Sequence, residues 1–113
     1  MAFTAHYETT EPTRDDIDAL PGVTVLEFGT PWCGHCIAAQ PLIESVLTAA
    51  TQVRHIKIED GSGRRLGRSF RVKLWPTLVF VQDAAEVARV VRPADAVAVR
   101  DALARLVSDP PAG

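Results

Sequence analysis

The order of apolar segments predicts an α/β protein, with a central mixed β-sheet and helices on both of its faces. Two observations carry this prediction. Helix-like segments separate successive apolar runs, and strands that are linked through helices form a parallel part of a sheet. The last two runs are separated only by a tight turn, which adds an antiparallel hairpin at the C-terminal end of the sheet. The runs lie at residues 23–28, 53–58, 77–81 and 86–91.

The N-terminal part predicts a strand, a short helix and a second strand. The first strand is expected at residues 3–7. Thr13, with Asp16 three residues later, forms a capping-box pattern that opens a helix, and Pro21-Gly22 ends it. Residues 23–28 are apolar and rich in β-branched side chains, which predicts a buried strand.

The central part predicts a long helix, a strand and a short helix. The long helix is expected over residues 34–50, with an apolar stripe, and Pro41 should kink it because proline lacks an N–H. The strand covers residues 53–58. A glycine-rich loop at 60–63 then leads to a short helix at 64–70.

The C-terminal part predicts the hairpin and a last helix. Pro93 suits the first turn of that helix. Four apolar residues give the helix a buried face: Val99, Leu103, Leu106 and Val107. Residues 108–113 are expected to fray.

Length and composition predict a single domain over residues 1–113. The 47% apolar content is enough for a core, and the net charge of −2 favours neither nucleic acid nor an anionic membrane as a partner. No apolar run approaches the roughly 20 residues of a membrane helix. The N-terminus lacks the pattern of a secretory signal, so we expect a cytoplasmic protein.

The only two cysteines, Cys33 and Cys36, lie where a strand meets the long helix. The first turn of a helix has unpaired N–H groups and a partial positive charge, which should lower the pKa of Cys33 below the value of about 8.5 for a free thiol. Cys36 lies one turn later, close enough to form a disulfide. In a reducing compartment such a pair is catalytic or metal-binding rather than structural.

Three segments together resemble the thioredoxin family: EFGTPWCGHC at 27–36, Pro41, and WPTL at 75–78. The resemblance covers nearly the whole chain. It implies the thioredoxin fold and thiol–disulfide exchange without a bound cofactor or metal. By position, Cys33 matches the attacking cysteine and Cys36 the resolving one. Pro76 matches the family's cis-proline.

Glu27 matches a buried acid that lies behind the resolving cysteine, where the family usually has aspartate. Burial should raise the pKa of its carboxyl group and make it a candidate base for Cys36. The alternative is an edge residue whose carboxylate reaches water. His55 and Lys57 share one face of the second predicted buried strand, and either could pair with Glu27.

His35 gives the segment the CGHC form, which looks like that of protein disulfide isomerases. A protonated imidazole beside Cys33 would stabilise its thiolate and make the disulfide more oxidising. The alternative is an exposed histidine with little effect.

The remaining candidate residues concern the substrate surface. Trp32 matches a tryptophan beside the dithiol, and Trp75 stands before the proline where the family usually has a smaller residue. The two rings could form a platform for a protein partner or pack into the core. Arg92 lies near the position of a glycine that the family has beside its substrate groove. The arginine side chain should narrow this groove or change its charge. Gly29 stands where many members have tryptophan.

The sequence therefore predicts an enzyme that reduces disulfide-bearing protein substrates, with electrons from a separate thiol or flavoprotein reductase. One alternative is a disulfide oxidant or isomerase. An alternative of another class is a metal-binding or scaffold protein, for which Cys33, Cys36 and His35 would supply fewer ligands than a zinc site needs.

Overall fold

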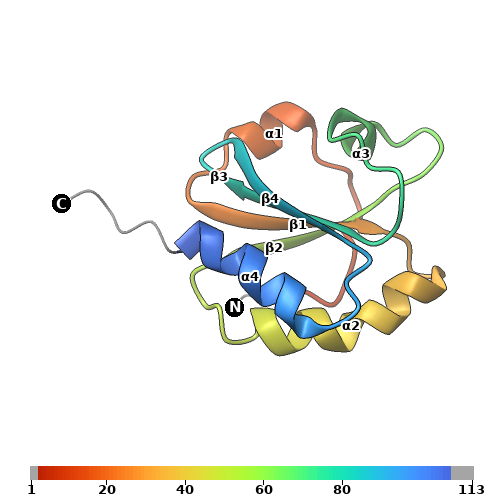
Figure 1. Ribbon diagram of the computed structural model, residues 1–113. Helices are drawn as coiled ribbons and strands as arrows, with labels where there is room; N and C mark the ends of the chain where they lie inside the picture. Colours follow the sequence, from red (N-terminus) through yellow and green to blue (C-terminus); the bar gives the residue numbers. More distant parts are fainter. Residues whose placement is uncertain (1–2, 108–113) are drawn as a thin grey trace.

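The computed structural model describes residues 3–107, and the C-terminal tail predicted at 108–113 lies outside them. The elements in chain order are α1 (Arg14–Asp18), β1 (Val23–Gly29), α2 (Gly34–Leu47), β2 (Arg54–Glu59), α3 (Arg65–Ser69), β3 (Thr77–Gln82), β4 (Ala85–Val91) and α4 (Ala96–Val107). Figure 1 shows the sheet between two helical layers, with α1 and α3 on one face and α2 and α4 on the other. The predicted fold class is confirmed.

The sheet has the strand order β2-β1-β3-β4. Strand β1 pairs with β2 in parallel, whereas β3 is antiparallel to both β1 and β4. The mixed sheet thus contains one parallel pair. The helical connection between β2 and β3 does not make those two strands neighbours, because β1 lies between them.

The strand predicted at residues 3–7 is wrong. Among the described residues, this segment forms only an isolated bridge between Tyr7 and Lys57. The backbone N–H of Thr4 donates to the His55 side chain at 2.8 Å, and the Thr4 hydroxyl donates to the His55 carbonyl at 2.9 Å. Side-chain bonds therefore replace the regular ladder that a strand would need.

Helix ends follow their capping groups. The capping box of Thr13 and Asp16 is present at α1. Helix α2 contains Pro41, as predicted, but ends at Leu47 rather than at residue 50. Helix α4 begins only at Ala96, because the Asp95 carboxylate accepts from the first backbone N–H groups of the helix. Pro93 consequently precedes the helix, and its predicted place in the first turn is wrong.

Two apolar clusters fill the spaces on either side of the sheet. The larger one joins α2 and α4 to β1, β3 and β4, and its members include Val25, Ile43, Leu47, Phe80 and Val99. The smaller one joins α1 and α3 to the other face through Ile17, Phe28, Leu66 and Val79. Alternate residues of β1 thus face opposite layers, which places Glu27 and Gly29 on the side of α2.

No helix within residues 3–107 is long and apolar enough to cross a membrane.

Candidate active site

Both cysteines are free thiols at the start of α2. Strand β1 ends at Gly29, and Cys33 is the N-cap residue of the helix, with φ −77° and ψ 123°. Cys33 is 9% exposed and Cys36 is 1% exposed. The helix start therefore keeps Cys33 near the surface and turns Cys36 inward.

The helix start favours the thiolate of Cys33. Burial by itself would raise the pKa of this thiol. Hydrogen bonds from the Cys36 backbone, the Cys36 thiol and the His35 backbone, together with the Arg92 charge, outweigh burial and lower the pKa of Cys33. The sequence-based expectation of a lowered pKa is consistent with this direction, and the N–H groups at the helix start are its main cause.

The pKa of the resolving cysteine, Cys36, is shifted in the opposite direction. Burial raises the pKa of Cys36 to about 11, and the Cys33 and Glu27 charges add to the effect. The backbone N–H of Thr30 opposes it by hydrogen bonding to the thiolate. The pKa of Cys33 is thus lower than that of Cys36, so Cys33 forms the nucleophilic thiolate more easily, while Cys36 keeps its proton.

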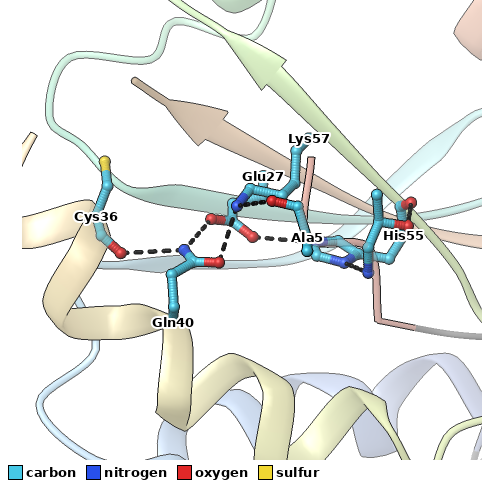
Figure 2. A network of polar contacts seen from close by, with 7 residues as sticks. Ala5, Glu27, Cys36, Gln40, His55 and Lys57 are labelled. Carbon is cyan, nitrogen blue, oxygen red and sulfur yellow. Dashed lines mark hydrogen bonds and ion pairs between the residues drawn. The ribbon is translucent and has the colours of Figure 1, made fainter. Parts of the chain in front are cut away.

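Glu27 is completely buried and lies in a network of polar side chains (Figure 2). Its Oε1 lies 2.9 Å from His55 Nε2, and its Oε2 accepts from Gln40 Nε2 at 2.7 Å. The predicted burial is confirmed, and the alternative of a water-exposed edge residue is wrong.

His55, rather than Lys57, is the direct partner of Glu27. The Lys57 ammonium group instead donates to Gln40 Oε1 at 2.8 Å and to the Ala5 carbonyl at 3.2 Å. Gln40 thereby separates the buried ammonium group from the buried carboxylate. It bridges them with one amide, whose oxygen faces Lys57 and whose nitrogen faces Glu27.

The hydrogen-bond pattern assigns the histidine tautomer. The Thr4 N–H donates to His55 Nδ1, so this nitrogen is an acceptor and the ring proton is on Nε2. Nε2 then donates to Glu27 Oε1. Both oxygens of Glu27 accept hydrogen bonds, which is the pattern of a carboxylate.

Glu27 reaches the resolving cysteine indirectly. Within the described chain its side-chain hydrogen bonds go to His55 and Gln40, and none goes to Cys36 Sγ. Gln40 Nε2 also donates to the Cys36 carbonyl at 3.0 Å. Figure 2 shows the Cys36 carbonyl, rather than its sulfur, facing Gln40, so the link runs through the backbone of α2.

Two residues of this region were missed by sequence reasoning. Gln40 stands four residues after Cys36 on α2, and a polar side chain on an otherwise inward-facing helical position was the available signal. Tyr7 comes from the N-terminal segment, and its pKa is raised by burial, by the Cys36 and Glu27 charges and by hydrogen bonding to Cys36. No sequence pattern connects Tyr7 with the dithiol.

The two tryptophans lie together beside the dithiol. Their rings are 5.8 Å apart in an edge-to-face arrangement. Trp32 is 70% exposed, while the half-buried Trp75 donates from Nε1 to Asp60 Oδ2 at 2.9 Å. Trp75 is therefore anchored and Trp32 is presented to solvent, an arrangement suited to a contact surface.

Pro76 and Arg92 are connected by hydrogen bonds. The Trp75–Pro76 peptide bond is cis. Arg92 donates from its backbone N–H to the Pro76 carbonyl at 3.0 Å and from Nε to the Trp75 carbonyl at 2.8 Å. Its φ of 47° lies in the left-handed region that glycine adopts most easily. Arg92 thus holds the Trp75–Pro76 segment by two hydrogen bonds and adds positive charge near Cys33.

His35 is exposed, and its backbone N–H is the part that acts on Cys33. Within residues 3–107, no group of three or more His, Cys, Asp or Glu side chains is arranged to hold a metal ion.

Comparisons with known proteins agree on one family. The thioredoxin family model matches residues 6–105. The structure of reduced thioredoxin 2 from Pseudomonas aeruginosa PAO1 is 55% identical, covers 94% of this chain and 98% of that one, and superposes with a TM-score of 0.84. Thioredoxin from Chlamydia trachomatis is 30% identical over 77% of this chain and 81% of its own length.

A further match is to the protein disulfide-isomerase erp38 of Neurospora crassa, which is 37% identical over 67 residues. That match spans 56% of this chain and only 18% of the isomerase. It therefore concerns one segment of a much longer protein.

Proposed function

Because this chain belongs to the thioredoxin family of thiol–disulfide oxidoreductases, we propose that it reduces disulfide bonds of protein substrates through Cys33 and Cys36. The observation that carries this proposal is the opposite shift of the two thiol pKa values: lowered at Cys33 and raised to about 11 at Cys36. One thiol is ready to attack, and the other stays protonated until a mixed disulfide forms.

The proposed reaction has two exchange steps. The Cys33 thiolate attacks one sulfur of the substrate disulfide, the substrate S–S bond breaks and a substrate thiolate leaves. Cys36 then loses its proton and attacks Cys33 Sγ, which forms the Cys33–Cys36 disulfide and releases the second substrate thiolate. Two electrons pass to the substrate, and no bound cofactor takes part.

Glu27 acts in this scheme as a buried negative charge rather than as a direct proton acceptor. Its charge raises the pKa of Cys36. The hydrogen bonds from His55 and Gln40 hold the carboxylate, and Gln40 connects it to the Cys36 carbonyl. We infer that this network keeps the resolving thiol protonated before the first step.

The surface around Cys33 is the proposed substrate site. Trp32 and Trp75 form its apolar side, Pro76 follows Trp75 through a cis peptide bond, and Arg92 adds charge. A partner in extended conformation would lay its disulfide against Cys33 and its neighbouring side chains against the tryptophan pair.

The oxidised form requires an electron donor. We propose a separate thiol or flavoprotein reductase, and a reducing compartment such as the cytoplasm, in which the glutathione poise favours the dithiol form.

The deciding experiment follows electron transfer to a disulfide-bonded protein such as insulin. Wild-type protein with a regenerating thiol should accelerate its reduction, Cys33→Ser should abolish the acceleration, and Cys36→Ser should accumulate a mixed disulfide at Cys33. Absence of that mixed disulfide by mass spectrometry would refute the assignment of the two roles.

Disulfide oxidation or isomerisation is the second candidate, favoured by His35 between the cysteines and by the segmental match to the Neurospora crassa isomerase. The equilibrium reduction potential against glutathione separates the candidates. A value near the roughly −270 mV typical of thioredoxin favours reduction, and one near about −180 mV favours the isomerase-like role. His35→Ala keeps the backbone N–H that acts on Cys33 and should lower the potential if the imidazole tunes it, whereas an unchanged value would exclude tuning by the imidazole.

A further inference from the structure

We propose that Tyr7 is a catalytic residue whose hydroxyl donates a hydrogen bond to Cys36 Sγ and stabilises this sulfur as a thiolate. The inference rests on the resolving role proposed above for Cys36. It adds a residue that belongs to none of the sequence motifs around the dithiol.

The N-terminal segment holds Tyr7 in place. Tyr7 forms the isolated bridge to Lys57, and the next N–H, that of Glu8, donates to the Lys57 carbonyl at 2.9 Å. The Lys57 ammonium nitrogen lies 4.6 Å from the centroid of the Tyr7 ring. The phenol is thus fixed by backbone and side chain to a central polar residue of the site.

Gly29 provides the space in which the hydroxyl and the sulfur meet. A Cβ atom at Gly29 would collide with Cys36 Sγ and would lie 3.3 Å from the Tyr7 hydroxyl oxygen. Both atoms therefore border the same small volume above the Gly29 Cα. Glycine at this position therefore leaves the volume open to the sulfur and the hydroxyl.

Tyr7 is suited to donate because it retains its proton. Burial, the Cys36 and Glu27 charges and hydrogen bonding to Cys36 raise the pKa of the phenol. A neutral O–H facing a thiolate makes a charge-assisted hydrogen bond, which is stronger than one between neutral groups. Glu27 cannot take this place, since as a carboxylate that accepts from His55 and Gln40 it has no proton to donate to a thiolate.

The proton of Cys36 has a route to solvent beside Tyr7. A pocket of about 600 Å³ borders both side chains, and its lining includes the exposed residues His6, Thr9 and Ile37. In the proposed step the Cys36 thiol releases its proton to water in this pocket. The Tyr7 O–H stabilises the resulting thiolate, which attacks Cys33 Sγ as the bond to the substrate sulfur breaks.

The reverse direction uses the same contact. When a donor thiolate attacks Cys33 of the oxidised protein, the Cys33–Cys36 bond breaks and Cys36 leaves as a thiolate. The same hydrogen bond then stabilises the leaving group, so Tyr7 would act in both halves of the cycle.

The test uses Tyr7→Phe, which removes the hydroxyl and keeps the ring over Lys57. A chromogenic aromatic disulfide first reacts with Cys33 of each variant, which forms a mixed disulfide and releases one aromatic thiolate. Cys36 then releases the second aromatic thiolate, and stopped-flow absorbance follows both steps. Tyr7→Phe should slow the second step by about tenfold, the expected size for a lost hydrogen bond to a charged group, and leave the first step within twofold. Thr9→Val removes another hydroxyl from the same pocket and should change neither step.

A second readout separates this proposal from the function on which it rests. In a Cys33→Ser background, the pH midpoint for alkylation of Cys36 should be higher when Tyr7→Phe is added than when Tyr7 is retained. Equal midpoints, or equal rates of the second step, would overturn the role of Tyr7. If Cys33 of the parent formed no mixed disulfide, the proposed function would fail, and the alkylation midpoint would still decide whether Tyr7 stabilises the thiolate.

Discussion

His55 Nε2 lies 2.9 Å from Glu27 Oε1, and both side chains are fully buried. The residue directly opposite Glu27 in the β1–β2 register is Lys57, while His55 is opposite Val25. The diagonal neighbour therefore makes the direct bond, and the opposite one is reached through the Gln40 amide. Four side chains thus form one network, in which His55 and Gln40 bind the buried carboxylate of Glu27 and Gln40 also binds the buried ammonium group of Lys57.

The His55–Glu27 bond should contribute strongly to stability. In His55→Phe the ring volume remains, but the buried carboxylate loses a donor and Thr4 loses its acceptor. We expect the free energy of unfolding to fall by about 3 kcal/mol, as for other broken buried polar pairs. Urea denaturation measures this, with the exposed His6→Phe as a control that should stay within about 0.5 kcal/mol. A loss below about 1 kcal/mol would contradict the importance of the bond.

Gln40 should be equally difficult to replace by an apolar residue. Gln40→Leu leaves the Glu27 carboxylate, the Lys57 ammonium group and the Cys36 carbonyl each with one partner fewer. We expect a loss of about 2–3 kcal/mol in unfolding free energy, because unsatisfied buried polar groups are costly. The exposed Gln52 provides the matched control, and Gln52→Leu should have almost no effect. Urea denaturation measures both variants, and similar denaturation midpoints for Gln40→Leu and Gln52→Leu would show that the Gln40 bridge is dispensable.

The two thiols should separate in a pH titration of alkylation. The pKa of Cys33 is lowered and that of Cys36 is about 11. Because the thiolate is the reactive form, iodoacetamide should label Cys33 below the pH at which a free thiol reacts, while Cys36 should react only in strongly alkaline solution. Peptide mass spectrometry of the reduced protein between pH 5 and pH 10, roughly spanning the ordinary thiol range, distinguishes the sites. Equal labelling of both thiols at neutral pH would be inconsistent with the structure.

Arg92 should affect the nucleophile more than the stability. Arg92→Gly removes a positive charge that lowers the pKa of Cys33, so the alkylation midpoint of Cys33 should rise. The lost hydrogen bond to the Trp75 carbonyl costs about 1 kcal/mol, and relief of the left-handed backbone offsets a similar amount. Stability should therefore change little.

The matched control for Arg92 is Arg100→Ala, which removes the same charge from an exposed position and avoids a glycine inside α4. It should leave the Cys33 midpoint unchanged. An equal shift in both variants would mean that net charge, rather than the position of Arg92, determines the effect.

Trp32 should matter for protein substrates only. Its ring is 70% exposed and packs edge-to-face against Trp75. Tryptophan is enriched among the few interface residues whose truncation costs more than about 1 kcal/mol. Trp32→Ala should lower kcat/KM for a protein disulfide about fivefold to tenfold, mainly through KM, with little change for a small aromatic disulfide. Val97→Ala, which truncates an exposed apolar side chain of α4, should affect neither. Equal losses for both substrates would place Trp32 in the chemistry rather than in docking.

The elements that were predicted well are those determined by neighbouring residues. The buried strand at β1, the capping box at Thr13 and the start of α2 at the CGHC segment all follow from local pattern. The errors have nonlocal or competing causes. Residues 3–7 form no strand because Thr4 makes hydrogen bonds with His55, which is distant in the sequence. Helix α4 begins after Asp95, which caps its first turn, and Pro93 lies before it.

The sequence by itself determined the order of the main elements and the position of the dithiol at a helix start, because both depend on spacing along the chain and on hydrophobic periodicity. The acid behind the dithiol was an expectation from the family resemblance, and the structure decided that Glu27 is buried rather than exposed at an edge. Only the tertiary structure decided which groups surround that acid and the resolving sulfur. Tyr7, Glu27, Gln40, His55 and Lys57 come from four separate segments, and their pairing depends on strand register and side-chain reach. Hydrogen bonds act over about 3 Å, so a shift of one residue in any of these segments would have produced a different network.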